Sequence, residues 1–191
     1  MKRKNLIIGI GTKAKDTIDN LYIKKRNFDF LCFNNKKQFL NLSKLKTVWF
    51  NDNEFQQTKG DMEYHIEILR KKNDILKKEL KKYKYAVVIM YSGEQFVSKT
   101  SKEFIKYLKE HISNFDILCI SPFKKDVIAN HYSNTTLNNL KDMSPNLFIY
   151  HSDDIFKISN PETIIEAEYN ISYKIGEILK MIFELRSKEN F

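Results

Sequence analysis

The sequence contains few cysteine, glycine and histidine residues, and this scarcity argues against several kinds of site. Only 2 of its 191 residues are cysteine and only 5 are glycine. Cys32 and Cys119 each lie inside an apolar run, so we expect two small buried hydrophobes without a disulfide or catalytic role. The four histidines are scattered singly without cysteine companions, and we therefore expect no metal site. Gly9-Ile-Gly11 lacks the third glycine of the dinucleotide-binding fingerprint.

Long hydrophobic runs are also missing. No run approaches the roughly 20 apolar residues that a membrane-spanning helix needs. The apolar stretch from Leu6 to Ile10 is too short for the core of a signal peptide, so we expect a cytoplasmic protein. The chain is still 42% hydrophobic with 14 Phe and 10 Tyr, which excludes a disordered protein. Its length predicts one domain over residues 1–191.

Basic residues are in excess, with a formal net charge of +9. Lysine runs occur at 2–4, 24–26, 70–72 and 77–84, and the basic face of a helix predicted over 62–84 is the best surface for a partner. Such an excess favours nucleic acid, an anionic membrane or an acidic protein as a partner, whereas lysine spread over several helices is more often a solvated face. The charge is therefore only a hint of function.

Short apolar runs alternate with helical segments along the chain. Most of the runs are continuous, which is typical of strands buried on both faces of a parallel sheet. We predict strands at Leu6–Ile10, Phe28–Phe33, Thr47–Phe50, Tyr85–Tyr91, Ile117–Ile120 and Leu147–Tyr150. The alternation predicts an α/β fold with a doubly wound, mostly parallel, Rossmann-like sheet. Such sheets bind ligands at the carboxyl ends of their strands.

The helices are predicted from apolar spacing and capping signals. One follows Gly11 through Ile18 and Leu21, and another has an apolar stripe from Met62 to Tyr83, with Asp61 as its N-cap. The capping-box pattern Thr100-Ser-Lys-Glu103 predicts the start of a third. A long last helix is predicted to open at Asn160-Pro161 and to run to about Lys188.

Several turns carry distinctive residue patterns. The segment from Asn34 to Leu40, after the second predicted strand, and the pair Pro122-Phe123 resemble the N-T-D-x-Q-x-L and P-F turns of FtsZ, the bacterial relative of tubulin. Asp153-Asp154-Ile-Phe resembles the N-D-R-L turn, and 160–185 resembles the long central helix. The resemblance covers essentially the whole chain in order. It implies the fold of the N-terminal, GTP-binding domain of FtsZ and tubulin.

The phosphate-binding loops depart from that family. The family holds phosphate with a loop of the form G-G-G-T-G-T/S-G, whose missing side chains let the backbone approach the anion. The matching positions here, Glu94 to Thr100, contain no glycine. In the first loop, Thr12-Lys-Ala-Lys15 replaces a glycine cluster. Lys13 and Lys15 could attract an anion or fill the empty site with their own ammonium groups, and we favour the second.

The resemblance implies a vestigial nucleotide site. Asp16 and Asp126 fall near the sugar-binding positions, and Ser172 replaces the Asp that reads the base. We expect no catalytic residue, no metal and no cofactor, with residual GTP or GDP binding as the exception. The candidate site consists of Gly9, Gly11, Thr12, Lys13, Lys15, Asp16 and Ser98.

The sequence ends at Phe191, before the position of the family's second domain and its water-activating loop, so we expect both to be absent. We therefore predict a non-hydrolysing FtsZ/tubulin-like domain that acts through protein contacts. It would self-associate or modulate a cytoskeletal, cell-division filament of FtsZ type. Two alternatives stay open. One is a GTP/GDP switch with an altered phosphate site, and the other is a basic module that binds nucleic acid or a membrane surface.

Overall fold

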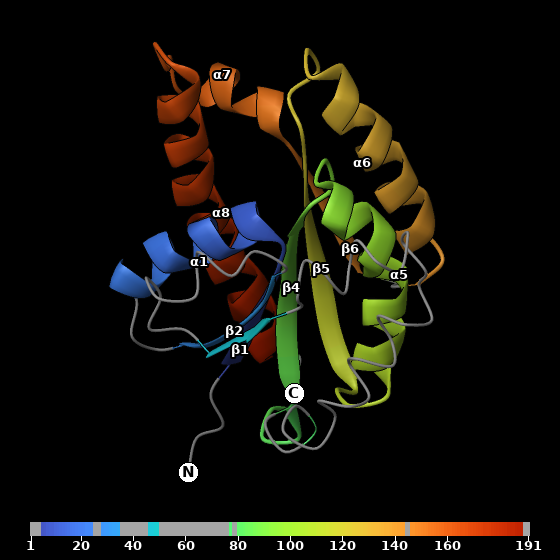
Figure 1. The fold of residues 1–191 in the computed structure, drawn as a ribbon. Coiled ribbons are helices and arrows are strands. Elements are labelled where there is room, and N and C mark those ends of the chain that lie inside the picture. Colours follow the sequence, from blue (N-terminus) through green and yellow to red (C-terminus); the bar gives the residue numbers. More distant parts are fainter. Residues whose placement is uncertain are drawn as a thin grey trace.

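The computed structural model describes residues 5–24, 28–34, 46–49, 77, 80–143 and 146–188. Its centre is a six-stranded sheet in the order β3-β2-β1-β4-β5-β6, and every neighbouring pair is parallel (Figure 1). The strands are β1 (Asn5–Ile10), β2 (Phe28–Asn34), β3 (Lys46–Trp49), β4 (Tyr85–Tyr91), β5 (Asn114–Ser121) and β6 (Leu147–His151). The predicted doubly wound parallel sheet is confirmed.

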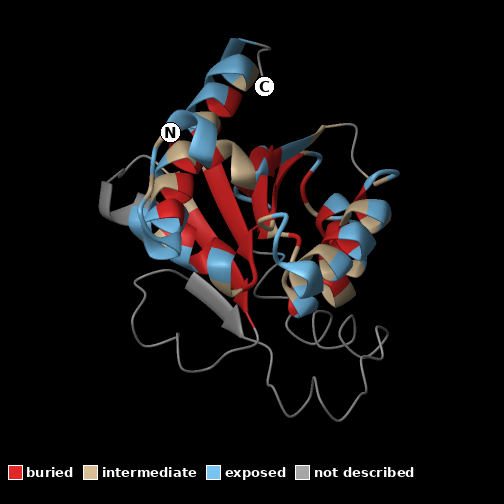
Figure 2. Cartoon of the chain, turned by 90° about the horizontal axis from the view of Figure 1, so that it is seen from above, coloured by how far each residue is buried: buried red, intermediate tan, exposed pale blue. Residues whose placement is uncertain are grey.

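Helices cover both faces of the sheet. Helices α1 (Thr12–Lys24) and α8 (Ile164–Lys188) pack on one face, and α5 (Gln95–Lys109) and α6 (Val127–Leu140) pack on the other. A short helix, α7 (Ile155–Ile158), follows β6. Figure 2 shows the buried strands as a red layer between the helices. Because both faces are covered, strands β1, β2, β4 and β5 are apolar at consecutive positions, as the sequence predicts.

Both cysteines are free and fully buried, as predicted. Cys32 belongs to the core beneath α1 and α8, and Cys119 belongs to the core beneath α5 and α6. Burial raises the pKa of each thiol to about 12, because the thiolate would lose its hydration. Each is therefore a neutral apolar side chain at physiological pH.

The prediction that a helix begins at Thr100 is wrong. Helix α5 begins at Gln95, and the Thr100 hydroxyl donates to the Phe96 carbonyl at 2.7 Å inside the helix. The predicted cap partner, Glu103, instead accepts from Lys106. The physical reason is burial: Phe96 and Val97 pack against the sheet, which adds a further apolar turn at the start of the helix.

The start of α8 and the existence of α6 also differ from the sequence expectation. Helix α8 begins after Thr163, whose hydroxyl accepts from the Glu166 amide at 3.1 Å, and Pro161 lies outside it. Helix α6 was not predicted, because its polar sequence has no apolar stripe. Both apolar and hydroxyl contacts hold it: Leu140 is buried in the core, the Ser133 hydroxyl lies 2.6 Å from that of Ser92, and Thr136 donates to the Ser92 carbonyl at 2.9 Å.

The predicted helix over 62–84 lies mostly outside the described residues. Lys77 and Leu80 are helical, and residues 81–84 form a turn and an irregular link to β4, so the predicted end of this helix is too late. The Asp61 cap and Phe50 also lie outside the described residues. None of the helices described is both long and apolar enough to cross a membrane.

A buried ion pair fixes the end of α8 at the amino edge of the sheet. The Arg186 guanidinium donates to both carboxylate oxygens of Asp116, from Nε and from Nη2, each at 3.0 Å. The Tyr85 hydroxyl donates to the same carboxylate at 2.7 Å. Asp116 is 1% exposed, so its charge depends on these partners. Burial, with the nearby carboxylate, raises the pKa of Tyr85 well above its ordinary value, so the phenol stays neutral.

We expect Arg186→Met to lower the free energy of unfolding by about 3 kcal/mol, because it leaves a buried carboxylate without its charged partner. Urea denaturation of the purified protein measures this loss. The control is Lys180→Met, which breaks an exposed pair with Glu184 and should cost under about 1 kcal/mol. Equal effects of the two substitutions would contradict a structural role for the buried pair.

Candidate functional site

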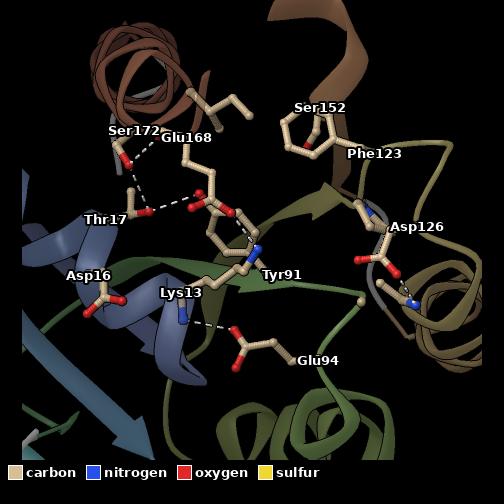
Figure 3. A pocket seen from close by; sticks show the side chains of 14 residues that line it. Lys13, Asp16, Thr17, Tyr91, Glu94, Phe123, Asp126, Ser152, Glu168 and Ser172 are labelled. Carbon is tan, nitrogen blue, oxygen red and sulfur yellow. Dashed lines mark hydrogen bonds and ion pairs between the residues drawn. The ribbon is translucent and has the colours of Figure 1, made fainter. Parts of the chain in front are cut away.

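A cavity of about 200 Å³ opens where the connections of the sheet diverge. Strands β1 and β4 are neighbours, but α1 leads from β1 toward β2, whereas α5 leads from β4 toward β5. This divergence is the topological switch point at which doubly wound sheets bind ligands. We call this space the switch-point cavity, and Figure 3 shows the side chains that line it.

The lining of the switch-point cavity is acidic. One lysine faces four carboxylates, which gives a formal charge of −3, opposite in sign to the +9 of the whole chain. The carboxylates are Asp16, Glu94, Asp126 and Glu168. The lysine, Lys13, pairs with Glu168 at 2.8 Å and thereby joins α1 to α8 (Figure 3). The cationic group in the lining is therefore already neutralised.

The carboxylate of Glu94 accepts hydrogen bonds from the first two residues of α1. Its Oε2 accepts from the Thr12 amide at 2.8 Å, and its Oε1 accepts from the Lys13 amide at 2.9 Å. The first N–H groups of a helix have no partner within the helix, and they attract anions. Glu94 also precedes α5 as its N-cap residue, but its side chain makes no capping bond there. The carboxylate thus occupies an anion position on another helix.

Gly11 makes room for this contact. Its φ of +94° lies in the left-handed region that favours glycine. A Cβ at this position would lie 2.8 and 2.9 Å from the two carboxylate oxygens of Glu94 and 2.9 Å from Val97. The carboxylate can therefore approach the amides only because residue 11 has no side chain.

Neutral hydroxyls line another part of the cavity. The Thr17 hydroxyl lies 3.0 Å from the Tyr91 hydroxyl and 3.4 Å from that of Ser172, which donates to the Glu168 carbonyl (Figure 3). Burial raises the pKa of Tyr91 to about 12, so the phenol is not ionised. These groups satisfy one another and add no positive charge to the cavity.

The fold is shared with known structures. CetZ2 from Haloferax volcanii, described as a GTPγS-bound protofilament, superposes with a TM-score of 0.75 at 16% identity, over 94% of this chain and 57% of that one. An empty FtsZ dimer from M. jannaschii superposes with a TM-score of 0.77 at 15% identity, over 97% of this chain and 55% of that one. The chain has an FtsZ/tubulin-like fold.

A third FtsZ/tubulin-like structure, TubZ of Clostridium botulinum phage c-st, gives a TM-score of 0.66 at 12% identity, over 94% of this chain and 59% of that one. The chain thus spans between 55 and 59% of the lengths of these three proteins. No protein-family model and no curated protein matches its sequence.

Four residues that the FtsZ resemblance assigned to a nucleotide site line the cavity. Lys13 and Asp16 come from α1, Asp126 comes from the loop after β5, and Ser172 comes from α8. Residues 13 and 126 are far apart in the sequence and are brought together by the parallel strands. Of these four residues, Lys13 and Asp16 belong to the seven-residue candidate site, whose part in nucleotide binding stays a prediction.

The other residues of the predicted site do not line the cavity. Gly9 and Gly11 give room to neighbouring side chains, since a Cβ on Gly9 would lie 2.6 Å from Ile18. Thr12 donates its amide to Glu94, and the Ser98 hydroxyl donates to the Gln95 carbonyl. Lys15 is 2% exposed and pairs with Asp19. Contrary to our expectation, the Lys15 ammonium group therefore points to Asp19 and does not fill the phosphate site.

Sequence reasoning missed Glu168, Tyr91 and the part that Glu94 plays. Glu168 lies one helical turn before Ser172, and this spacing could have placed it on the same face of α8. Glu94 was noted only as a residue that replaces a glycine. Within the described residues, no group of three or more His, Cys, Asp or Glu side chains is placed to hold a metal ion.

We expect Gly11→Ala to lower the free energy of unfolding by about 1–3 kcal/mol, because alanine is strained at this φ and its Cβ would collide with Glu94. In a Glu94→Ala background the collision with the carboxylate is gone, so the same substitution should cost less. A double-mutant cycle in urea measures the difference. Costs that add within about 0.5 kcal/mol would mean that the two residues are independent.

Proposed function

We propose that this chain is a non-hydrolysing domain of FtsZ/tubulin-like fold that acts through protein contacts and does not need a nucleotide. The observation that carries the proposal is the Glu94 carboxylate, which accepts from the Thr12 and Lys13 amides at 2.8 and 2.9 Å. A phosphate group would need those same donors. It would have to displace a carboxylate that the chain itself holds in place.

Charge and space support the same proposal. A triphosphate would enter a lining with a formal charge of −3, in which the Lys13 ammonium already pairs with Glu168. Like charges at close range raise the free energy of binding. The volume of about 200 Å³ is also below the roughly 300–1,000 Å³ of pockets that enclose drug-sized ligands.

We expect isothermal titration of the purified protein with GTPγS, GTP or GDP to show no binding at micromolar concentrations, and GTP incubated with the protein to remain intact. The physical reason is that both amide donors are already satisfied by Glu94. A micromolar dissociation constant for any of the three nucleotides, or release of phosphate, would refute the proposal.

The protein contact that we propose is with a second copy of the chain, arranged head to tail. Highly exposed apolar residues lie at the carboxyl edge of the sheet: Val127 and Ile128 are 78% and 72% exposed at the start of α6, and Ile165 is 81% exposed at the start of α8. These segments lie at the same end of the molecule as α7 (Figure 1). Large apolar side chains that are exposed at one end of a molecule are candidates for a protein contact.

Charge complementarity favours a second copy as the partner. The switch-point cavity opens at the carboxyl edge with its excess of carboxylates. Exposed lysines lie at the opposite edge, because Lys81, Lys82 and Lys84 precede β4 and Lys109 ends α5. The two edges can meet only head to tail, which gives a heterologous contact. The CetZ2 structure is described as a protofilament and the FtsZ structure as a dimer, which agrees with this proposal.

We expect sedimentation velocity to show association that increases with protein concentration. Replacing Val127 and Ile128 by serine should weaken it at least about tenfold, since roughly 1.5 kcal/mol or more of apolar burial would be lost. Reversing Lys81 and Lys82 to glutamate should also weaken it. The control is Tyr173→Ser, which removes an exposed aromatic side chain from the middle of α8, between the two edges, and should leave association unchanged. A monomer at every concentration would contradict self-association.

A further inference from the structure

We propose that β6 is an interface at which two copies of this chain pair strand to strand, antiparallel, about a two-fold axis. β6 is the last strand in the order β3-β2-β1-β4-β5-β6, and it pairs with β5 on one side. We call its other side, over residues 147–151, the β6 edge. This contact is separate from the head-to-tail contact proposed above, because it uses the side of the sheet and not the ends of the strands. It goes beyond the proposed function and does not depend on it.

The main chain of β6 carries hydrogen-bonding groups on this edge. In a strand, the N–H and C=O groups of one residue point to one side, and those of the next residue point to the other. The Asn146 carbonyl accepts from the Ile117 amide of β5 at 3.0 Å, so the groups of Asn146, Phe148 and Tyr150 point toward β5. Those of Leu147 and Ile149 therefore point away from it. Within the part of the chain that the structure describes, no strand pairs with the β6 edge.

The position of Ile149 makes the β6 edge complementary to itself. Ile149 is the middle residue of the five in β6. In an antiparallel pair, two facing residues whose groups point toward each other exchange both N–H to C=O hydrogen bonds. A two-fold axis beside Ile149 places it opposite Ile149 of the second copy, and places Leu147 opposite His151 of that copy. Because one strand supplies both halves of the contact, the contact is isologous and closes as a dimer.

The side chains of β6 are apolar and partly exposed on both faces of the sheet. Leu147 packs on the core beneath α5 and α6, and Ile149, two residues later on the same face, is 43% exposed. Phe148 lies on the opposite face, with Tyr150, and is 38% exposed. In the proposed register Phe148 lies opposite Tyr150 of the second copy, which is a favourable aromatic pair. β6 contains no lysine or proline, with which natural edge strands commonly prevent such pairing.

The lack of charge beside the β6 edge favours a second copy as the occupant. Asp, Glu, Lys and Arg make up 30% of the chain, yet none occurs in α6 or in residues 146–151. Helix α5 connects β4 to β5 and α6 connects β5 to β6, so α6 is the outer of the two and lies nearest this edge (Figure 1). A two-fold axis brings identical groups together, so like charges beside it would repel.

The charged residues that follow β6 do not oppose this arrangement. Lys157 of α7 pairs with Asp154 at 2.6 Å, so the two charges offset each other within one copy. Two copies can thus approach along the β6 edge although each carries a formal net charge of +9. The excess of lysine lies in other segments of the chain.

Disulfide cross-linking tests the register of the pair. Ile149→Cys should form a linked dimer on mild oxidation with diamide, because facing residues in such a pair have Cα atoms about 5.5 Å apart, within the range of a disulfide. The matched control is Phe148→Cys, the preceding residue of the strand, which is nearly as exposed. Its two copies would lie about 7–8 Å apart. Cys32 and Cys119 are buried and neutral, so neither competes.

Both cysteine variants carry Val127→Ser and Ile128→Ser, which weaken the head-to-tail contact. We expect at least about tenfold more linked dimer from Ile149→Cys than from Phe148→Cys, since Cα atoms more than about 7 Å apart are not bridged without movement of the backbone. Similar amounts of linked dimer from the two variants would overturn the proposal.

Sedimentation velocity in the same Val127→Ser, Ile128→Ser background measures the dimer without a cross-link. Ile149→Lys should raise its dissociation constant at least about tenfold, because two ammonium groups would meet at the axis. The control is Tyr169→Lys, which adds the same charge at an exposed position on α8 and should leave the dimer unchanged. Circular dichroism checks that each variant is folded, and if Ile149→Lys does not fold, the two cysteine variants decide.

A monomer at every concentration in this background would also overturn the proposal. That failure is distinct from failure of the head-to-tail contact, which is measured on the wild type. A wild type that stops at a dimer, with Ile149→Cys linked, would contradict the head-to-tail contact and support pairing through β6.

Discussion

The contact of the Glu94 carboxylate with the first two amides of α1 is the interaction on which the character of this domain depends. It joins the loops that follow β1 and β4, the two strands between which the chain connections diverge. Other features of the cavity agree with it. Gly11 leaves space for the carboxylate, and Lys13 turns its ammonium group to Glu168 on α8. The start of α1, where helices commonly bind free anions, instead binds the carboxylate of Glu94.

Strands β1, β2, β4 and β5 could be predicted because most of their residues are buried on both faces of the sheet, so each contains a continuous apolar run. The helices were less predictable where local signals and burial disagree. Thr100 and Glu103 form a good capping pattern, but the burial of Phe96 and Val97 extends α5 past it. Helix α6 could not be predicted from apolar spacing, because its buried residues are Ser133, Thr136 and a single apolar one, Leu140.

The edge of the sheet at which the cavity lies could be predicted from the fold class, but most of the residues that line the cavity could not. A parallel α/β sheet indicates its carboxyl edge, and Lys13, Asp16, Asp126 and Ser172 do line the cavity there. The role of Glu94 depends on which amides its side chain reaches, and that is set by strand pairing between residues 82 positions apart. Lys15 is a different case, because it pairs with Asp19 four residues later on α1, a helical spacing that the sequence already contains.

The charges at the two edges of the sheet affect how two molecules approach each other in solution. Among the described residues, the lining of the switch-point cavity has an excess of carboxylates where the strands end, and Lys81, Lys82 and Lys84 lie where β4 begins. These two local charges are opposite in sign and lie at opposite edges of the sheet. In the head-to-tail association that we propose, they attract each other in dilute salt before short-range contacts form, so they bias the orientation of an encounter.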